Sequence, residues 1–157
     1  STQAKTLFPY TTLFRSIMLM AGDVQRGSLC TSDGVSAAIE FAVLQLKVET
    51  VLVLGHAQCG GVAAALQDRP RNPNSFLDAW ISLLDTAKAR VSGHEGDHHT
   101  ELEYESIRVT LENLATFPFV AEAIQTRGLR LAGARYGVAD GSLELMDPTT
   151  GAFSPVV

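Results

Sequence analysis

VLVLGHAQCGGV, residues 51–62, is the stretch that decides the fold we expect for this chain of 157 residues. Its first four residues form a continuous apolar run rich in valine, which is typical of a parallel strand covered on both faces. Gly55 ends the run, and Gly60 and Gly61 close a short turn from which a helix can begin, over 62–66. The stretch therefore predicts a strand, a turn and a helix in immediate succession.

His56 and Cys59 stand three residues apart in the predicted turn. Imidazole nitrogen and thiolate sulfur are donors that zinc prefers, and a short turn lets both aim at one ion about 2.0 to 2.3 Å away. The dipole of the next helix also favours a thiolate at Cys59. The pair predicts half of a zinc site, although a His and a Cys at the end of a buried strand are also compatible with ordinary core packing. A complete site needs at least one further protein ligand.

The rest of the chain reads as alternating helices and strands. Apolar residues recur at helical spacing over 35–46, after a Ser32 or Asp33 cap, and this helix leads directly into the strand at 51–54. Such a βαβ arrangement places the turn at the carboxyl end of the strand, where open α/β sheets have their sites. Asp140-Gly141 predicts a hairpin turn and hence an antiparallel edge. We expect further helices over 76–91, capped by Asn74 or Ser75, over 101–115 and over 120–125, and the hairpin strands over 129–138 and 142–147.

Composition sets limits on the class of protein. The chain is 46% hydrophobic and 18% charged, which suits a single globular domain with one sizeable core. Its formal charge of -5 and the lack of a Lys/Arg cluster argue against a nucleic-acid partner. No apolar run reaches the roughly 18 residues that span a bilayer, so we expect no membrane partner. Two cysteines make no disulfide framework, and a reducing cytoplasm fits a thiolate ligand best.

The segment GHAQCGGVAAAL, residues 55–66, preceded by TSDGVSAAIEFAVLQLKVETVLVL, closely resembles the β-class carbonic anhydrases, whose zinc signature is Gly-His-x-x-Cys-Gly-Gly. The resemblance runs from about Met20 to Val157. It implies an α/β fold of three layers, with a mostly parallel central sheet, flanking helices and an antiparallel edge strand. It also implies a lyase that uses Zn2+ to hydrate carbon dioxide reversibly to bicarbonate, as a homodimer or higher homo-oligomer, and the cysteine usage predicts that it is cytoplasmic.

By this resemblance, His56 and Cys59 are two of three protein ligands of zinc, with water in the fourth position. The family takes its other ligand from a Cys-x-Asp-x-Arg motif at the end of the first strand, and the Asp and Arg of that motif orient the metal-bound water. This motif is absent here, so the catalytic residues are unknown and we expect the chain as written to be impaired. Residues 1–16 contain neither Cys nor Asp, and we interpret them as a foreign or disordered segment before a single domain, 17–157, that lacks the family's first strand.

Three other groups of side chains have two interpretations each. We interpret Cys30 as a small residue at a helix entrance, with ligation in place of the missing cysteine as the alternative. His98 and His99 belong to the polar segment 92–99, which we expect to be a solvated linker, with transient zinc binding as the alternative. Arg135 and Tyr136 are expected to be a solvent-facing cation and a half-buried ring, with bicarbonate binding as the alternative.

Two other functions also stay open on these residues. One is an inactive zinc-binding homologue that keeps the fold for oligomerisation. The other is a thiol enzyme in which His56 acts as the base for Cys59. Metal content distinguishes the thiol enzyme from the rest, because a thiol enzyme needs no zinc.

Overall fold

A computed structural model gives the fold of residues 16–20, 34–93 and 96–156, with only the backbone of 16–20 described. The predicted foreign segment therefore lies outside the described residues, except for Ser16, which begins the first strand. The predicted caps Ser32 and Asp33 also lie outside them.

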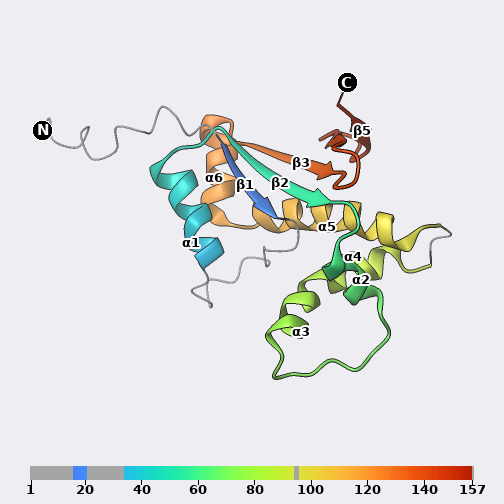
Figure 1. The fold of residues 1–157 in the computed structure, drawn as a ribbon. Helices are drawn as coiled ribbons and strands as arrows, with labels where there is room; N and C mark the ends of the chain where they lie inside the picture. Colours follow the sequence, from blue (N-terminus) through green and yellow to red (C-terminus); the bar gives the residue numbers. More distant parts are fainter. Residues whose placement is uncertain (1–15, 21–33, 94–95, 157) are drawn as a thin grey trace, which may run out of the picture.

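The centre of the fold is a mixed five-stranded sheet in the order β1-β2-β3-β4-β5 (Figure 1). The first three strands run parallel and the last two are antiparallel to their neighbours, which confirms the predicted parallel sheet with an antiparallel edge. The hairpin turn at Asp140-Gly141 is also confirmed, and Gly141 has the positive φ of 74° that such a turn requires. The strands are β1 Ser16–Met20, β2 Thr50–His56, β3 Arg130–Tyr136, β4 Leu143–Met146 and β5 Phe153–Pro155.

The helices lie near the predicted positions, and two of their differences in length and continuity have a clear local cause. The helix predicted over 76–91 is interrupted by a short 3-10 turn, where Ser82 Oγ donates a hydrogen bond to the Ala79 carbonyl and competes with regular helix geometry. The helix predicted over 120–125 is longer, because Pro118 suits its first position and Gly128, at φ 71°, ends it. The elements are α1 Gly34–Glu40 with the π-helical η1 Phe41–Gln45, α2 Gly60–Leu66, α3 Phe76–Ile81 with η2 Ser82–Leu84, α4 Asp85–Val91, α5 His98–Ala115 and α6 Pro118–Arg127.

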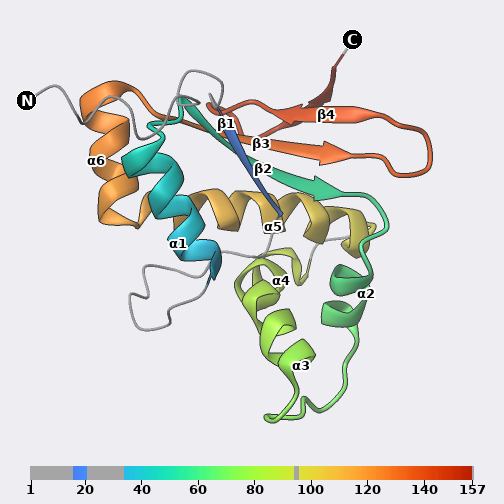
Figure 2. The ribbon, with the colours of Figure 1, turned by 60° about the vertical axis from the view of Figure 1, so that its left-hand side comes forward.

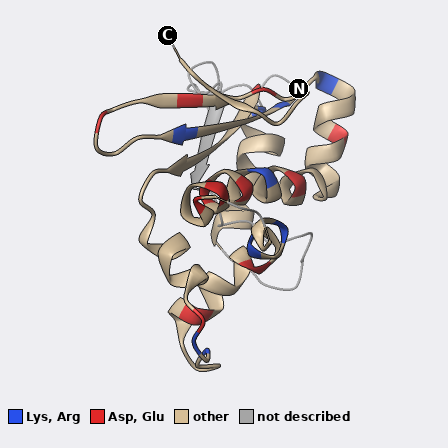
Figure 3. Ribbon diagram, turned by 90° about the vertical axis from the view of Figure 1, so that its right-hand side faces the viewer, with Lys and Arg blue, Asp and Glu red and all other residues tan. Residues whose placement is uncertain are grey.

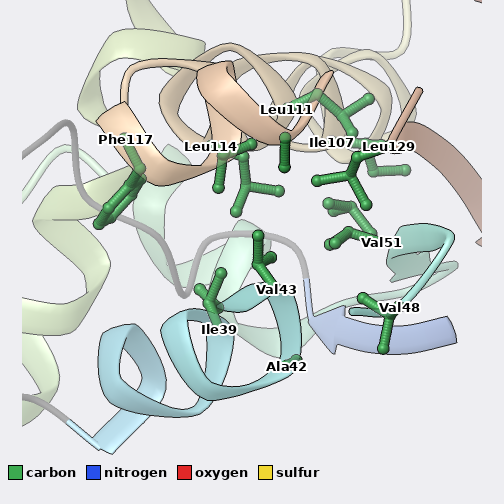
Figure 4. Packing of buried hydrophobic residues seen from close by; sticks show 13 residues of the cluster. Ile39, Ala42, Val43, Val48, Val51, Ile107, Leu111, Leu114, Phe117 and Leu129 are labelled. Atoms are coloured by element: carbon green, nitrogen blue, oxygen red, sulfur yellow. The ribbon is translucent and has the colours of Figure 1, made fainter. Parts of the chain in front are cut away.

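Helix α5 belongs to two hydrophobic cores. Its C-terminal half packs with η1 and β2, through Ile107, Leu111 and Leu114 (Figure 4). Its N-terminal half contributes Leu102 to a second cluster with α2 and α4, and these helices lie together on the side of α5 away from the sheet (Figures 1 and 2). Helix α5 therefore connects the sheet to the segment that follows the His-Cys turn.

Strand β2 is buried more on one face than on the other. Val51 and Val53 are fully buried, whereas Leu52 and Leu54 keep partial exposure. The strand was predicted to be buried on both faces. One face is fully buried, and the other is only partly buried. None of the described helices is both long enough and apolar enough to cross a membrane.

Candidate metal centre

His56 is the last residue of β2 rather than part of the turn, which corrects the predicted end of the strand at Leu54. Its backbone pairs with Tyr136 of β3, and the Ala57 N–H donates a hydrogen bond of 2.8 Å to the Tyr136 carbonyl. Parallel pairing with β3 therefore continues beyond the apolar run, because backbone hydrogen bonds do not depend on side-chain type. His56 lies at the carboxyl edge of the parallel strands, as the βαβ arrangement predicts.

The imidazole of His56 has one nitrogen engaged with the backbone. Nδ1 lies 3.0 Å from the Ala57 carbonyl oxygen. Because a carbonyl can only accept, Nδ1 carries the proton in this contact and Nε2 keeps its lone pair. This is the tautomer in which Nε2 can bind a metal, and the backbone contact fixes the orientation of the ring.

The turn between His56 and Cys59 contains a residue in the left-handed region. Gln58 has φ 57°, a conformation that costs a residue other than glycine about 1 to 3 kcal/mol and persists only where the surroundings hold it. Cys59 then adopts an extended conformation and is the N-cap of α2, with a free, half-buried thiol that makes no capping hydrogen bond. The sulfur is therefore available as a metal ligand.

Gly60 and Gly61 differ in their surroundings. A Cβ on Gly61 would lie 2.6 Å from Cζ3 of Trp80 and 3.7 Å from the Cys59 sulfur, so the indole packs against the first turn of α2 beside the thiol. A Cβ on Gly60 would meet no described heavy atom within 4 Å. The lack of a side chain at Gly61 therefore accommodates the indole ring of Trp80, whereas Gly60 has no such neighbour among the described residues.

Glu103 is a residue of this site that the sequence did not reveal. It lies on α5 with its side chain 1% exposed, and its Oε1 accepts a hydrogen bond of 3.2 Å from the Cys59 N–H. The other carboxylate oxygen, Oε2, binds Arg135 of β3, with Nε at 2.8 Å and Nη2 at 2.7 Å. Acidic and basic residues both occur along α5 (Figure 3). The sequence therefore gives no sign that one carboxylate of this helix is buried.

Arg135 was expected to face solvent, and this expectation is wrong. Its side chain is only 14% exposed, because alternate residues of β3 face α5, as the contacts of Gly133 with Ile107 show. Arg135 also binds Glu144 at 2.9 Å. Burial lowers the pKa of Arg135, but the hydrogen bonds that it donates to Glu103 and Glu144 outweigh this effect and the net pKa is raised.

Tyr104 closes the same network from α5. Its hydroxyl donates to Glu144 at 2.9 Å, and the guanidinium of Arg135 lies 5.0 Å from the centre of its ring. Burial raises the pKa of Tyr104, and the hydrogen bond to Glu144 adds to this shift. Arg135 is thus shared by two carboxylates, and Tyr104 donates a further hydrogen bond to one of them. Tyr136, by contrast, is 41% exposed, so its ring is more exposed than the half-buried ring that was expected.

The predicted linker 92–99 is shorter than expected. Asp97 caps α5 by accepting from the His99 N–H at 3.0 Å, so the helix already begins at His98. Nδ1 of His99 lies 3.0 Å from Oε1 of Glu103, which turns this ring toward the carboxylate.

His56 and Cys59 provide the donor chemistry that suits zinc, but only two donors. Within 16–20, 34–93 and 96–156, no three His, Cys, Asp or Glu side chains gather in a way that could hold a metal ion. Cys30, the alternative ligand, lies outside the described residues. The described part of the chain therefore fits half of a zinc site, and a third protein donor would have to come from elsewhere.

Comparisons with known proteins show which family shares this fold and turn. The family model for carbonic anhydrase matches residues 17–143. Beta carbonic anhydrase 3 of Arabidopsis thaliana is 34% identical over 131 residues, which cover 76% of this chain and 51% of that protein. The chain thus spans about half the length of this curated relative.

Solved structures agree with the match. The β-carbonic anhydrase CafA of Aspergillus fumigatus has 32% sequence identity and a TM-score of 0.67, covering 84% of this chain and 62% of that one. A tetrameric β-carbonic anhydrase of Sordaria macrospora, at 20% identity, has a TM-score of 0.72 and covers 97% of this chain and 89% of its own. The second likeness supports the fold alone.

Proposed function

Because the chain belongs to the β-class carbonic anhydrase family, we propose that it contributes two of the three protein ligands of a zinc-dependent carbonate dehydratase, which interconverts carbon dioxide and bicarbonate. The proposed ligands are Nε2 of His56 and the sulfur of Cys59. The observation that carries the proposal is the Gly-His-x-x-Cys-Gly-Gly turn at the carboxyl edge of β2, with His56 in the tautomer that leaves Nε2 for a metal.

The chain's own residues would bind and orient in this reaction. The Ala57 carbonyl holds the ring of His56, and Glu103 holds the backbone of Cys59. Zinc, when bound, supplies the Lewis acidity that makes water a nucleophile near neutral pH. The indole of Trp80 packs against the first turn of α2, on the side where the Cys59 sulfur also approaches Gly61.

The third ligand and the orienting Asp-Arg pair are not among the described residues. The printed sequence contains no Cys-x-Asp-x-Arg motif, and two donors hold zinc weakly. We therefore expect this chain, as printed, to bind zinc below stoichiometry and to hydrate carbon dioxide poorly. An inactive zinc-binding homologue would use the same two ligands. It would differ only in failing to hydrate carbon dioxide.

A thiol enzyme has less support. In the described part of the chain, no hydrogen bond joins the Cys59 thiol to His56, whose Nδ1 is directed to the Ala57 carbonyl. The base that would activate the thiol is therefore not in place.

We also propose that the chain forms a homo-oligomer in a reducing compartment. Helix α3 exposes Phe76 at 96%, Leu77 at 58% and Trp80 at 37%, an apolar surface of the kind that subunits cover. The related Sordaria macrospora enzyme is tetrameric. A reducing compartment keeps the Cys59 thiol available as a ligand.

Cobalt(II) titration of the purified chain tests the ligand assignment without depending on activity. Binding to Cys59 should give a thiolate-to-cobalt charge-transfer band in the near ultraviolet. Cys59→Ala should abolish the band, and His56→Ala should weaken cobalt binding about tenfold or more. Two matched controls, Cys30→Ala and His98→Ala, should leave the band and the affinity unchanged. A band that survives Cys59→Ala, or is lost in Cys30→Ala, would refute the assignment.

A further inference from the structure

Glu103 connects three elements that meet at the His-Cys turn. Its Oε1 accepts a hydrogen bond from the Cys59 N–H at 3.2 Å and lies 3.0 Å from Nδ1 of His99. Its Oε2 accepts a hydrogen bond from Nε of Arg135 at 2.8 Å and forms an ion pair with Nη2 of Arg135 at 2.7 Å. One carboxylate thus ties the N-cap of α2 and the start of α5 to the end of β3.

A buried carboxylate is costly for packing alone. Taking an ionised group out of water is unfavourable unless it is paired and hydrogen-bonded, and an apolar side chain of the same size would fill this space at lower cost. Glu103 is paired through Arg135, which is itself fixed by Glu144 and lies over the ring of Tyr104. The carboxylate is therefore held in one orientation, with Oε1 directed at the turn.

The turn needs such a support. Gln58, immediately before Cys59, has a positive φ, and Cys59 makes no capping hydrogen bond with its own side chain. Among the described residues, the Cys59 carbonyl accepts a hydrogen bond from the Ala63 N–H, and the Cys59 N–H donates one to Glu103. Loss of this bond would free the peptide that sets the direction of the Cys59 side chain.

We propose that Glu103 is a positioning residue, which fixes the Cys59 peptide by its Oε1 while Arg135 locks its Oε2, and so orients the Cys59 thiol toward the ligand position beside His56. The inference rests on the proposed role of Cys59 as a ligand. It concerns the geometry of the turn and can be measured without metal.

The test compares Glu103→Gln with Glu105→Gln in the purified chain. Glu105 is a matched control, because it lies on the same helix and binds Arg90 and Arg108 at 2.9 Å. Among the described residues, it makes no hydrogen bond to Cys59. Amide hydrogen exchange of Cys59, followed by NMR and normalised to Val53 in the centre of β2, reports the hydrogen bond directly. In Glu103→Gln we expect exchange about 10- to 100-fold faster, and in Glu105→Gln no change.

Two further readouts separate this inference from the proposed function. Cobalt affinity should fall about 10- to 100-fold in Glu103→Gln and stay constant in Glu105→Gln. If Cys59→Ala leaves cobalt binding intact, the ligand assignment fails, while the amide hydrogen exchange of Cys59 in the Glu103 variant still decides the positioning role.

Glu103→Asp replaces the glutamine variant in this test if the glutamine variant does not fold. Aspartate keeps the charge but is one methylene too short to reach both partners. Unchanged normalised Cys59 exchange in whichever variant folds would overturn the inference.

Discussion

Replacing Gly61 by alanine should destabilise the protein, although alanine is the better helix former. The new methyl group would lie 2.6 Å from Cζ3 and 2.7 Å from Cη2 of Trp80, well inside van der Waals contact. Overpacking of this kind typically costs about 1 to 3 kcal/mol. Trp80 is 37% exposed, so the indole can turn away from α2, and we expect a cost near the lower end of that range.

Gly60→Ala is the matched control, because a Cβ there meets no described heavy atom within 4 Å. Alanine gains up to about 1 kcal/mol over glycine in a helix, and less in the first turn. The same gain applies to both variants. The free energy of unfolding of Gly61→Ala should therefore be about 1 kcal/mol below that of Gly60→Ala, near the lower end of the range for overpacking.

Urea unfolding followed by far-ultraviolet circular dichroism measures this difference. The chain has a single tryptophan, so its fluorescence emission should shift to the red in Gly61→Ala, as the indole moves into water, and stay constant in Gly60→Ala. The double variant Gly61→Ala/Trp80→Leu should lose less stability than the two single changes together. Equal stabilities of the two alanine variants, with unchanged emission, would refute the packing argument.

Two further predictions concern stability away from the turn. The pKa of Asp78 is lowered from 3.8 by the hydrogen bond from Arg69 and then by the Asn72 N–H, so its stabilising effect is complete above pH 3.8 and is lost as the pH falls below it. Urea unfolding from neutral to acidic pH should show this loss in the wild type and a flatter profile in Asp78→Asn. Arg127 donates to the carbonyls of Val48 at 2.6 Å and Val43 at 3.0 Å, and Arg127→Ala should cost about 1 to 3 kcal/mol by urea unfolding. A loss below the error of the measurement would show that water replaces the guanidinium at both carbonyls.

Much of the fold follows from local sequence patterns. The apolar run at 51–54 predicted β2, helical spacing predicted α1 and α5, and Asp140-Gly141 predicted the hairpin, because each of these signals acts over a few residues. Ser75 caps α3 as predicted, with its side chain accepting from the Asp78 N–H. Strand β5 has only three residues and no alternation of apolar and polar side chains, so its pairing with β4 could not be predicted.

The site was predictable only where its residues are neighbours in sequence. His56 and Cys59 were found because they share one turn. Glu103 and Arg135 are 32 residues apart, and their contact arises only when β3 is laid on α5. Charged residues on helices and strands are usually exposed, so Arg135 was expected to face solvent and no local signal marked Glu103 as buried. Their burial is a property of the tertiary structure.

The most direct test of the ligand assignment and of the missing third donor is zinc per chain in the purified 157-residue protein, measured together with carbon dioxide hydration by the same sample. We expect zinc well below one ion per chain, a further loss in Cys59→Ala, and hydration no faster than buffer. Stoichiometric zinc with rapid hydration would contradict this account, because it would show that the chain completes its own site with a third ligand.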